Sequence, residues 1–126
     1  IVSGLFYLLS RLPWWLLYLV GDGIYVLLYY VFGYRKKVVA ANLLIAFPEK
    51  TDAERKQIEK KFYHNFVDTF IETIKLFSVS EAEMRKRVSC NIEVVNQLYE
   101  SGQNVQIVTG HYFNWEVANL GVALTC

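Results

Sequence analysis

The sequence predicts an α/β protein in which membrane-associated helices precede a helical layer and the first strands of an α/β domain. Apolar and aromatic residues are concentrated in the first 34 positions, and apolar residues in the middle of the chain recur at helical spacing. After Cys90, helical and strand-like segments alternate. We therefore expect a membrane-associated helical segment over residues 1–34 and the N-terminal part of an α/β domain over residues 35–126.

The composition excludes two broad classes of protein. Hydrophobic residues make up 54% and aromatic residues 16% of the 126 positions, which is too apolar for a disordered chain. The 13 basic and 12 acidic residues give a net charge of +1, so no basic surface predicts nucleic acid as a partner. The two cysteines, Cys90 and Cys126, form no C-x-x-C pair. They predict free thiols in a reducing compartment and no metal site.

The first apolar segment has the length of a membrane helix. Residues 14–32 contain a single charge, Asp22, and a helix of 19 residues reaches about 28 Å, close to the thickness of a bilayer core. The triplet Gly-Asp-Gly at 21–23 disfavours an unbroken helix, so a single span and two shorter helices in one leaflet both remain open. A buried helical hairpin of a soluble protein is the third alternative. The basic run at 35–37 indicates a cytoplasmic exit from the membrane.

Two helices are predicted next. The stretch "RKKVVAANLLIAF" at 35–47 is helical in propensity and ends before Pro48. Thr51 and Glu54 form a capping box that opens the longest helix, which extends to about residue 77. The expected core face of this helix consists of Ile58, Phe62, Phe66, Val67, Phe70, Ile71, Ile74 and Phe77.

Polar residues on the same helix are interpreted as solvated. Asp68, Glu72 and Lys75 share another side of the helix, and Glu72 is one turn away from Lys75, a spacing that allows an ion pair. His64 has no partner at ligand spacing and is interpreted as a surface or capping residue.

The last third of the chain alternates between helix and strand. A second capping box, Ser80 to Glu83, predicts a short basic helix that ends near Val88. "CNIEV" at 90–94 and "NVQIVT" at 104–109 are predicted as strands. A helix between them ends at Gly102.

The end of the second strand leads into the chemically most suggestive motif. His111 would lie at the carboxyl end of that strand, where open α/β sheets bind ligands. Asn114 suits the N-cap of a helix that begins at Trp115, which places Glu116 in the first turn. Glu116 then either stabilises the helix start or orients the His111 imidazole as a general base for acyl transfer. The spacing leaves both interpretations open.

Three stretches together resemble a known family. "YRKKVVAANLLIAFPEK" at 34–50, "KFYHNFVDTFIETIKL" at 61–76 and "GHYFNWE" at 110–116 follow the aromatic apolar segment. In this order they resemble the lauroyl and myristoyl transferases of lipid A biosynthesis, which are lysophospholipid acyltransferase-like enzymes of Gram-negative bacteria. The resemblance covers essentially the whole chain.

The resemblance implies a reaction and a site. His111 and Glu116 match the catalytic H-x4-D/E motif of the family, as base and orienting partner, and Asn114 and Trp115 would shape the turn and contact substrate. The implied reaction moves a fatty acyl chain from acyl carrier protein to a hydroxyl of a lipid A precursor, a membrane lipid, at the cytoplasmic face of the bacterial inner membrane. No metal and no bound organic cofactor is implied.

Two departures from the family qualify this expectation. Phe113 stands where many members carry a small residue, and a larger side chain would narrow the approach to His111. Relatives also continue well beyond the motif, so we expect the sequence to be an N-terminal fragment truncated after the H-x4-E motif and inactive by itself. The alternatives are an acyltransferase for a glycerophospholipid or aminolipid, and a non-catalytic membrane-bound interaction module.

Overall fold

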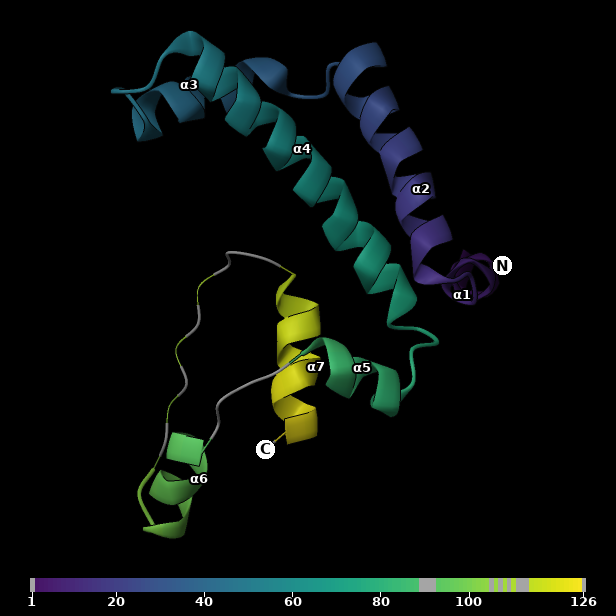
Figure 1. Ribbon diagram of the computed structural model, residues 1–126, viewed down its shortest axis with the longest axis vertical. Helices are drawn as coiled ribbons and strands as arrows, with labels where there is room; N and C mark the ends of the chain where they lie inside the picture. The colour runs from purple at the N-terminus through teal and green to yellow at the C-terminus, as the bar shows by residue number, and fades with distance from the viewer. Residues whose placement is uncertain are drawn as a thin grey trace. The chain divides into compact units, whose positions relative to one another are not determined.

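The computed structural model describes residues 2–88, 93–104, 106, 108, 110 and 114–125. Figure 1 shows the chain as a succession of helices joined by loops. These elements are α1 (Val2–Ser10), α2 (Trp14–Val26), the π-helical turn η1 (Leu27–Val31), α3 (Lys36–Ala46), α4 (Asp52–Lys75), α5 (Glu81–Arg87), α6 (Glu93–Glu100) and α7 (Trp115–Thr125). The predicted α/β class is therefore wrong, because every regular element in the described ranges is a helix.

Neither predicted strand is formed by its described residues. Glu93 and Val94, at the end of the first predicted strand, open α6 instead. In the second, Asn104, Gln106 and Val108 belong to no regular element, and the Val108 side chain is 84% exposed. The other residues of both segments lie outside the described ranges. A strand is stabilised by hydrogen bonds to a neighbouring strand, and the described residues provide none.

The predicted helices, in contrast, are confirmed to within a few residues. α3 ends at Ala46, two residues before Pro48. α6 is closed as expected, because Gly102 adopts a left-handed φ of +74° and the Gln103 amide donates to the Leu98 carbonyl over 3.2 Å.

The chain divides into two compact units, and each is described by itself. Residues Leu12–Ile71 form the helical core unit, with α2, η1, α3 and most of α4. Residues Ile1–Arg11 and Glu72–Cys126 form the motif unit, which includes α1, the last turn of α4, α5, α6 and α7.

In the helical core unit, α2 packs closely against α4 at a glycine. A Cβ atom on Gly21 would lie 3.2 Å from Ile71 Cγ1 and 3.7 Å from Val67 Cγ1. Leu17 joins Val67 and Ile71 in the buried centre, surrounded by partly buried Leu12, Tyr25 and Leu28. The helix runs unbroken through residues 21–23, so of the two alternatives left open at this triplet the described helix favours the uninterrupted one. Gly21 has no Cβ atom, which lowers its helix propensity but allows α2 to lie close to α4.

The buried face of α4 is narrower than the sequence predicts. Tyr63, Val67 and Ile71 are buried, whereas Phe62 and Phe70 are 45% and 57% exposed. The phenylalanine rings contact one another along the helix instead: Phe62 and Phe66 are stacked with centroids 5.9 Å apart, and Phe66 and Phe70 meet edge to face with centroids 5.1 Å apart. Two neighbouring apolar stripes satisfy the same helical spacing, and the buried one is the stripe whose Val67 and Ile71 lie against Gly21.

The predicted capping box at the start of α4 is confirmed. The Thr51 amide donates to Glu54 Oε2 over 2.8 Å, and the Glu54 amide donates back to Thr51 Oγ1 over 3.3 Å. Two amides that lack helical partners are thereby satisfied. The hydrogen bond from the Thr51 backbone, followed by that from its side chain, lowers the pKa of Glu54 below its usual value.

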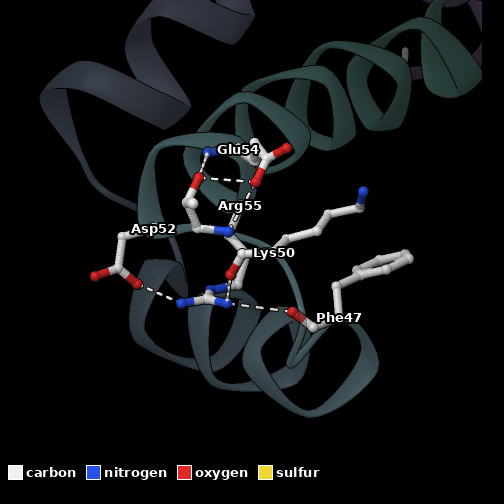
Figure 2. A network of polar contacts seen from close by, with 6 residues as sticks. Phe47, Lys50, Asp52, Glu54 and Arg55 are labelled. Atoms are coloured by element: carbon white, nitrogen blue, oxygen red, sulfur yellow. Dashed lines mark hydrogen bonds and ion pairs between the residues drawn. The ribbon is translucent and has the colours of Figure 1, made fainter.

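Arg55 holds the turn between α3 and α4, as Figure 2 shows. Its guanidinium donates to the Phe47 carbonyl over 3.2 Å, and also to the Lys50 carbonyl and the Asp52 carboxylate. A single planar cation thus binds the carbonyl of the residue that caps α3 and a carbonyl of the loop before α4.

In the motif unit, the end of α4 is tied to the end of α1. Lys75 is buried and its Nζ donates to the Ser10 carbonyl over 2.9 Å, while Ser78 Oγ donates to the same oxygen over 2.7 Å. The C-terminal carbonyls of a helix carry partial negative charge, which favours a cation at this position. The interpretation of Lys75 as a solvated residue is therefore wrong.

α5 and α7 pack together in the same unit. α5 begins at the predicted cap, where Ser80 Oγ accepts from the Glu83 amide over 3.2 Å. A Cβ atom on Gly121 of α7 would lie only 2.2 Å from Val88 Cγ1, just past the end of α5. The contact therefore requires glycine at this position.

α2 and η1 form one continuous helical stretch, Trp14–Val31. By length and composition it could cross a membrane, and 17% of it is buried. Its exposed large side chains are Trp15, Leu19, Val20, Ile24, Val26, Leu27, Tyr30 and Val31. One side of the stretch thus packs on α4, and its other sides present apolar groups.

Candidate active site at the H-x4-E motif

The described part of the predicted site lies at the start of α7. Asn114 precedes the helix, Trp115 is its first residue and Glu116 lies in its first turn. His111, the predicted base, lies outside the described residues, as does Phe113. The predicted order of cap, helix start and acidic first turn is confirmed.

Asn114 is the N-cap that the sequence predicts. Its Oδ1 accepts from the Val117 amide over 3.2 Å, and its backbone carbonyl accepts from the Ala118 amide over 3.1 Å. The side chain is 6% exposed, so this cap is part of the packed interior of the motif unit. A buried cap fixes where α7 begins.

Glu72, which the sequence analysis interprets as a solvated residue, binds the side chain of Asn114. Asn114 Nδ2 donates to Glu72 Oε2 over 3.1 Å, across 42 positions of sequence. Glu72 was expected to face solvent beside Lys75, but its carboxylate points toward the start of α7. Helical spacing in the sequence shows that Glu72 and Lys75 lie on the same side of α4. It does not show that the start of α7 contacts Glu72 on that side.

Glu116 lies where a carboxylate is favoured by the exposed amides of a helix start. Its side chain is half-buried, and none of the described residues forms a hydrogen bond or ion pair with it. Trp115 is 50% exposed. The first turn of α7 places the backbone of Glu116 on a regular element, which is the kind of support that an orienting partner of a base requires.

His64, interpreted as a surface or capping residue, has two acidic partners in the helical core unit. Its Nε2 lies 2.8 Å from Asp22 Oδ1, and its Nδ1 lies 3.0 Å from Asp68 Oδ2. The i, i+4 spacing of His64 and Asp68 was the available signal. With a carboxylate at each ring nitrogen and no nucleophile among these three residues, the cluster links α2 to α4 and does not form a catalytic triad.

No group of three or more histidine, cysteine, aspartate or glutamate side chains suited to a metal ion occurs among the residues described.

Comparison with known proteins places this arrangement in a family. The model of the bacterial lipid A biosynthesis acyltransferases matches residues 1–124 of the chain. No curated protein and no solved structure that was compared with the chain matches it. The match includes the apolar helices, α4 with Glu72, and the H-x4-E motif with its capped helix. The chain therefore belongs to the bacterial lipid A biosynthesis acyltransferase family.

Proposed function

We propose that the protein transfers a fatty acyl chain from acyl carrier protein to a hydroxyl group of a lipid A precursor. The family match over residues 1–124 carries this proposal, because it includes the motif at 110–116. The capped start of α7 adds support, since it holds Glu116 in a defined turn two residues after a buried anchor.

In the proposed reaction His111 is the general base. It takes the proton of the acceptor hydroxyl while that oxygen attacks the carbonyl carbon of the carrier's thioester. The carbon–sulfur bond breaks, the new ester remains on the lipid, and the protonated imidazole returns its proton to the leaving thiolate. Glu116 orients the imidazole and stabilises its positive charge, as the acidic member of a base pair does. No metal or bound organic cofactor takes part.

The proposed site of action is the cytoplasmic face of the bacterial inner membrane. The apolar stretch Trp14–Val31, with large apolar side chains exposed on it, supports attachment to lipid. The basic run at 35–37 begins after three further residues and suits anionic lipid headgroups on that face.

The test is an assay of the complete gene product with acyl carrier protein charged with a radiolabelled fatty acid. A lipid A precursor, a glycerophospholipid and an aminolipid are offered in parallel in mixed micelles. The proposal predicts label on the lipid A precursor and, with His111→Ala, a loss of that label. Label on one of the other lipids would reassign the acceptor, and label on none of the three would favour a non-catalytic membrane-bound module.

A further inference from the structure

The Glu72 carboxylate connects α4 to the start of the motif helix. Glu72 Oε2 accepts from Asn114 Nδ2 over 3.1 Å, and Asn114 Oδ1 accepts from the Val117 amide over 3.2 Å. We propose that Glu72 is a positioning residue for acyl transfer, which acts through Asn114 on the segment that carries His111 and Glu116. This inference rests on the proposed function.

The chemistry of the two side chains gives this contact a direction. An ionised carboxylate only accepts hydrogen bonds, so the NH₂ group of the Asn114 amide must face Glu72. The amide oxygen must then face the Val117 amide, which is the orientation that caps α7. A hydrogen bond to a charged acceptor is roughly twice as strong as one between neutral groups, and Asn114 is 6% exposed, so water competes little. Glu72 therefore selects the orientation of the cap.

The position of the cap limits both proposed catalytic groups. Glu116 follows Asn114 by two residues in the first turn of α7, so it moves with the start of that helix. His111 precedes Asn114 by three residues, which keeps the two Cα atoms within about 11 Å even in an extended chain. General-base catalysis depends on the placement of the base, and a displacement of about 1 Å can lower the rate about 10²-fold.

Four variants of the complete gene product test this inference. Glu72→Ala removes the acceptor, so kcat should fall about 10- to 100-fold with a smaller change in KM. Glu72→Gln keeps an oxygen that accepts from Asn114 and should remain within about fivefold of wild type, because only the assistance of the charge is lost. Asn114→Asp keeps the capping oxygen but places two carboxylates against each other, so kcat should fall.

The double variant Glu72→Gln with Asn114→Asp reverses donor and acceptor. The introduced glutamine amide donates to the introduced carboxylate, which can still cap Val117, so kcat should recover relative to Asn114→Asp alone. Amide hydrogen exchange at Val117 should follow the same order, with faster exchange in Glu72→Ala and Asn114→Asp and slower exchange in the double variant. This recovery distinguishes positioning from a general loss of stability.

Glu59→Ala is the matched control, since Glu59 is a buried glutamate of the same helix whose carboxylate pairs with Lys56 over 3.2 Å. It should lower the melting temperature and leave kcat near wild type. Wild-type kcat in Glu72→Ala, or a double variant no more active than Asn114→Asp, would overturn the role of Glu72. Absence of acyl transfer by the wild-type protein would instead overturn the proposed function, and this inference with it.

Discussion

Two glycines of α2, Gly21 and Gly23, differ in whether the neighbouring helix leaves room for a side chain. Gly21 faces α4, where an added Cβ atom would lie 3.2 Å from Ile71 Cγ1, whereas nothing lies within 4 Å of a Cβ atom added to Gly23. Both positions are inside α2, so both gain the same helix propensity when glycine is replaced. The difference in stability between the two substitutions therefore reports the cost of packing a methyl group against α4.

We predict that Gly23→Ala stabilises the protein by up to about 1 kcal/mol, through helix propensity alone. Gly21→Ala gains the same amount but must displace Ile71, and overpacking of this kind costs about 1 to 3 kcal/mol. Thermal melts of both variants in the same detergent should therefore place Gly21→Ala below Gly23→Ala. Equal melting temperatures would show that α2 and α4 are not in close contact at Gly21.

At the residue scale, the sequence predicted local roles well and distant partners poorly. Asn114 was identified as an N-cap because the signal for a cap lies within three residues of it. The partners of Glu72 and His64 on other elements lie 42 positions away in the chain. Helical spacing shows which side of a helix a residue occupies, but it does not show which segment that side will contact.

At the element scale, helix starts were predictable because capping boxes are local. The bonds between Thr51 and Glu54, and between Ser80 and Glu83, occur as the sequence indicates. Strands were not predictable in this way. A stretch rich in β-branched residues, such as residues 104–109, needs a second strand to pair with, and its own sequence does not specify that strand. The broad apolar face of α4 was ambiguous for a similar reason, since α2 selects which stripe is buried.

The capping box of α4 should make stability depend on acidity. Hydrogen bonds from Thr51 lower the pKa of folded Glu54 below the ordinary value of 4.5. A group with a lowered pKa in the folded state contributes stability above its unfolded pKa and loses it as the pH falls through the folded value. The melting temperature of wild type should therefore fall more steeply below about pH 4.5 than that of Glu54→Gln.

Glu49→Gln provides the control, since it removes the same charge from the same turn outside the capping box. Melting curves of wild type, Glu54→Gln and Glu49→Gln, recorded at steps of about one pH unit between about pH 3 and pH 7, would cover the pH range in which Glu54 is protonated. An acid dependence of Glu54→Gln identical to that of wild type would show that the carboxylate does not stabilise the start of α4.

For the whole molecule, the exposed apolar side of Trp14–Val31 predicts attachment to lipid. Membranes from cells that express the complete gene product should retain it through a high-salt wash and a carbonate wash. Leu19→Glu with Val26→Glu adds two charges to exposed positions of α2 and should shift the protein toward the soluble fraction, since charged side chains are costly in the hydrocarbon region.

Gln57→Glu with Asn65→Glu is the matched control for that experiment. Both residues are exposed on α4, and the pair adds the same charge outside the apolar stretch. This variant should fractionate like wild type. Release of the wild-type protein by salt alone would contradict attachment through the apolar stretch.

For the whole molecule, the proposed acyl transfer depends on the proposed pairing of His111 with Glu116, and one substitution tests this pairing most directly. Glu116→Gln keeps the shape of the side chain and loses the charge that stabilises a protonated imidazole. As a helix-start residue alone, Glu116 would contribute about 0.3 to 1 kcal/mol to stability and nothing to chemistry. As the partner of a general base, its loss should lower turnover toward that of His111→Ala, whose expected decrease is about 10²-fold or more.

The decisive measurement is the rate of acyl transfer by purified Glu116→Gln in the complete gene product, together with its melting temperature. Asn114→Ala serves as the reference for a lost cap, which should cost about 1 kcal/mol in stability and affect turnover mainly through a loosened turn. We predict a large loss of turnover in Glu116→Gln with a melting temperature near that of wild type. Near-normal turnover in this variant would contradict the paired-base mechanism.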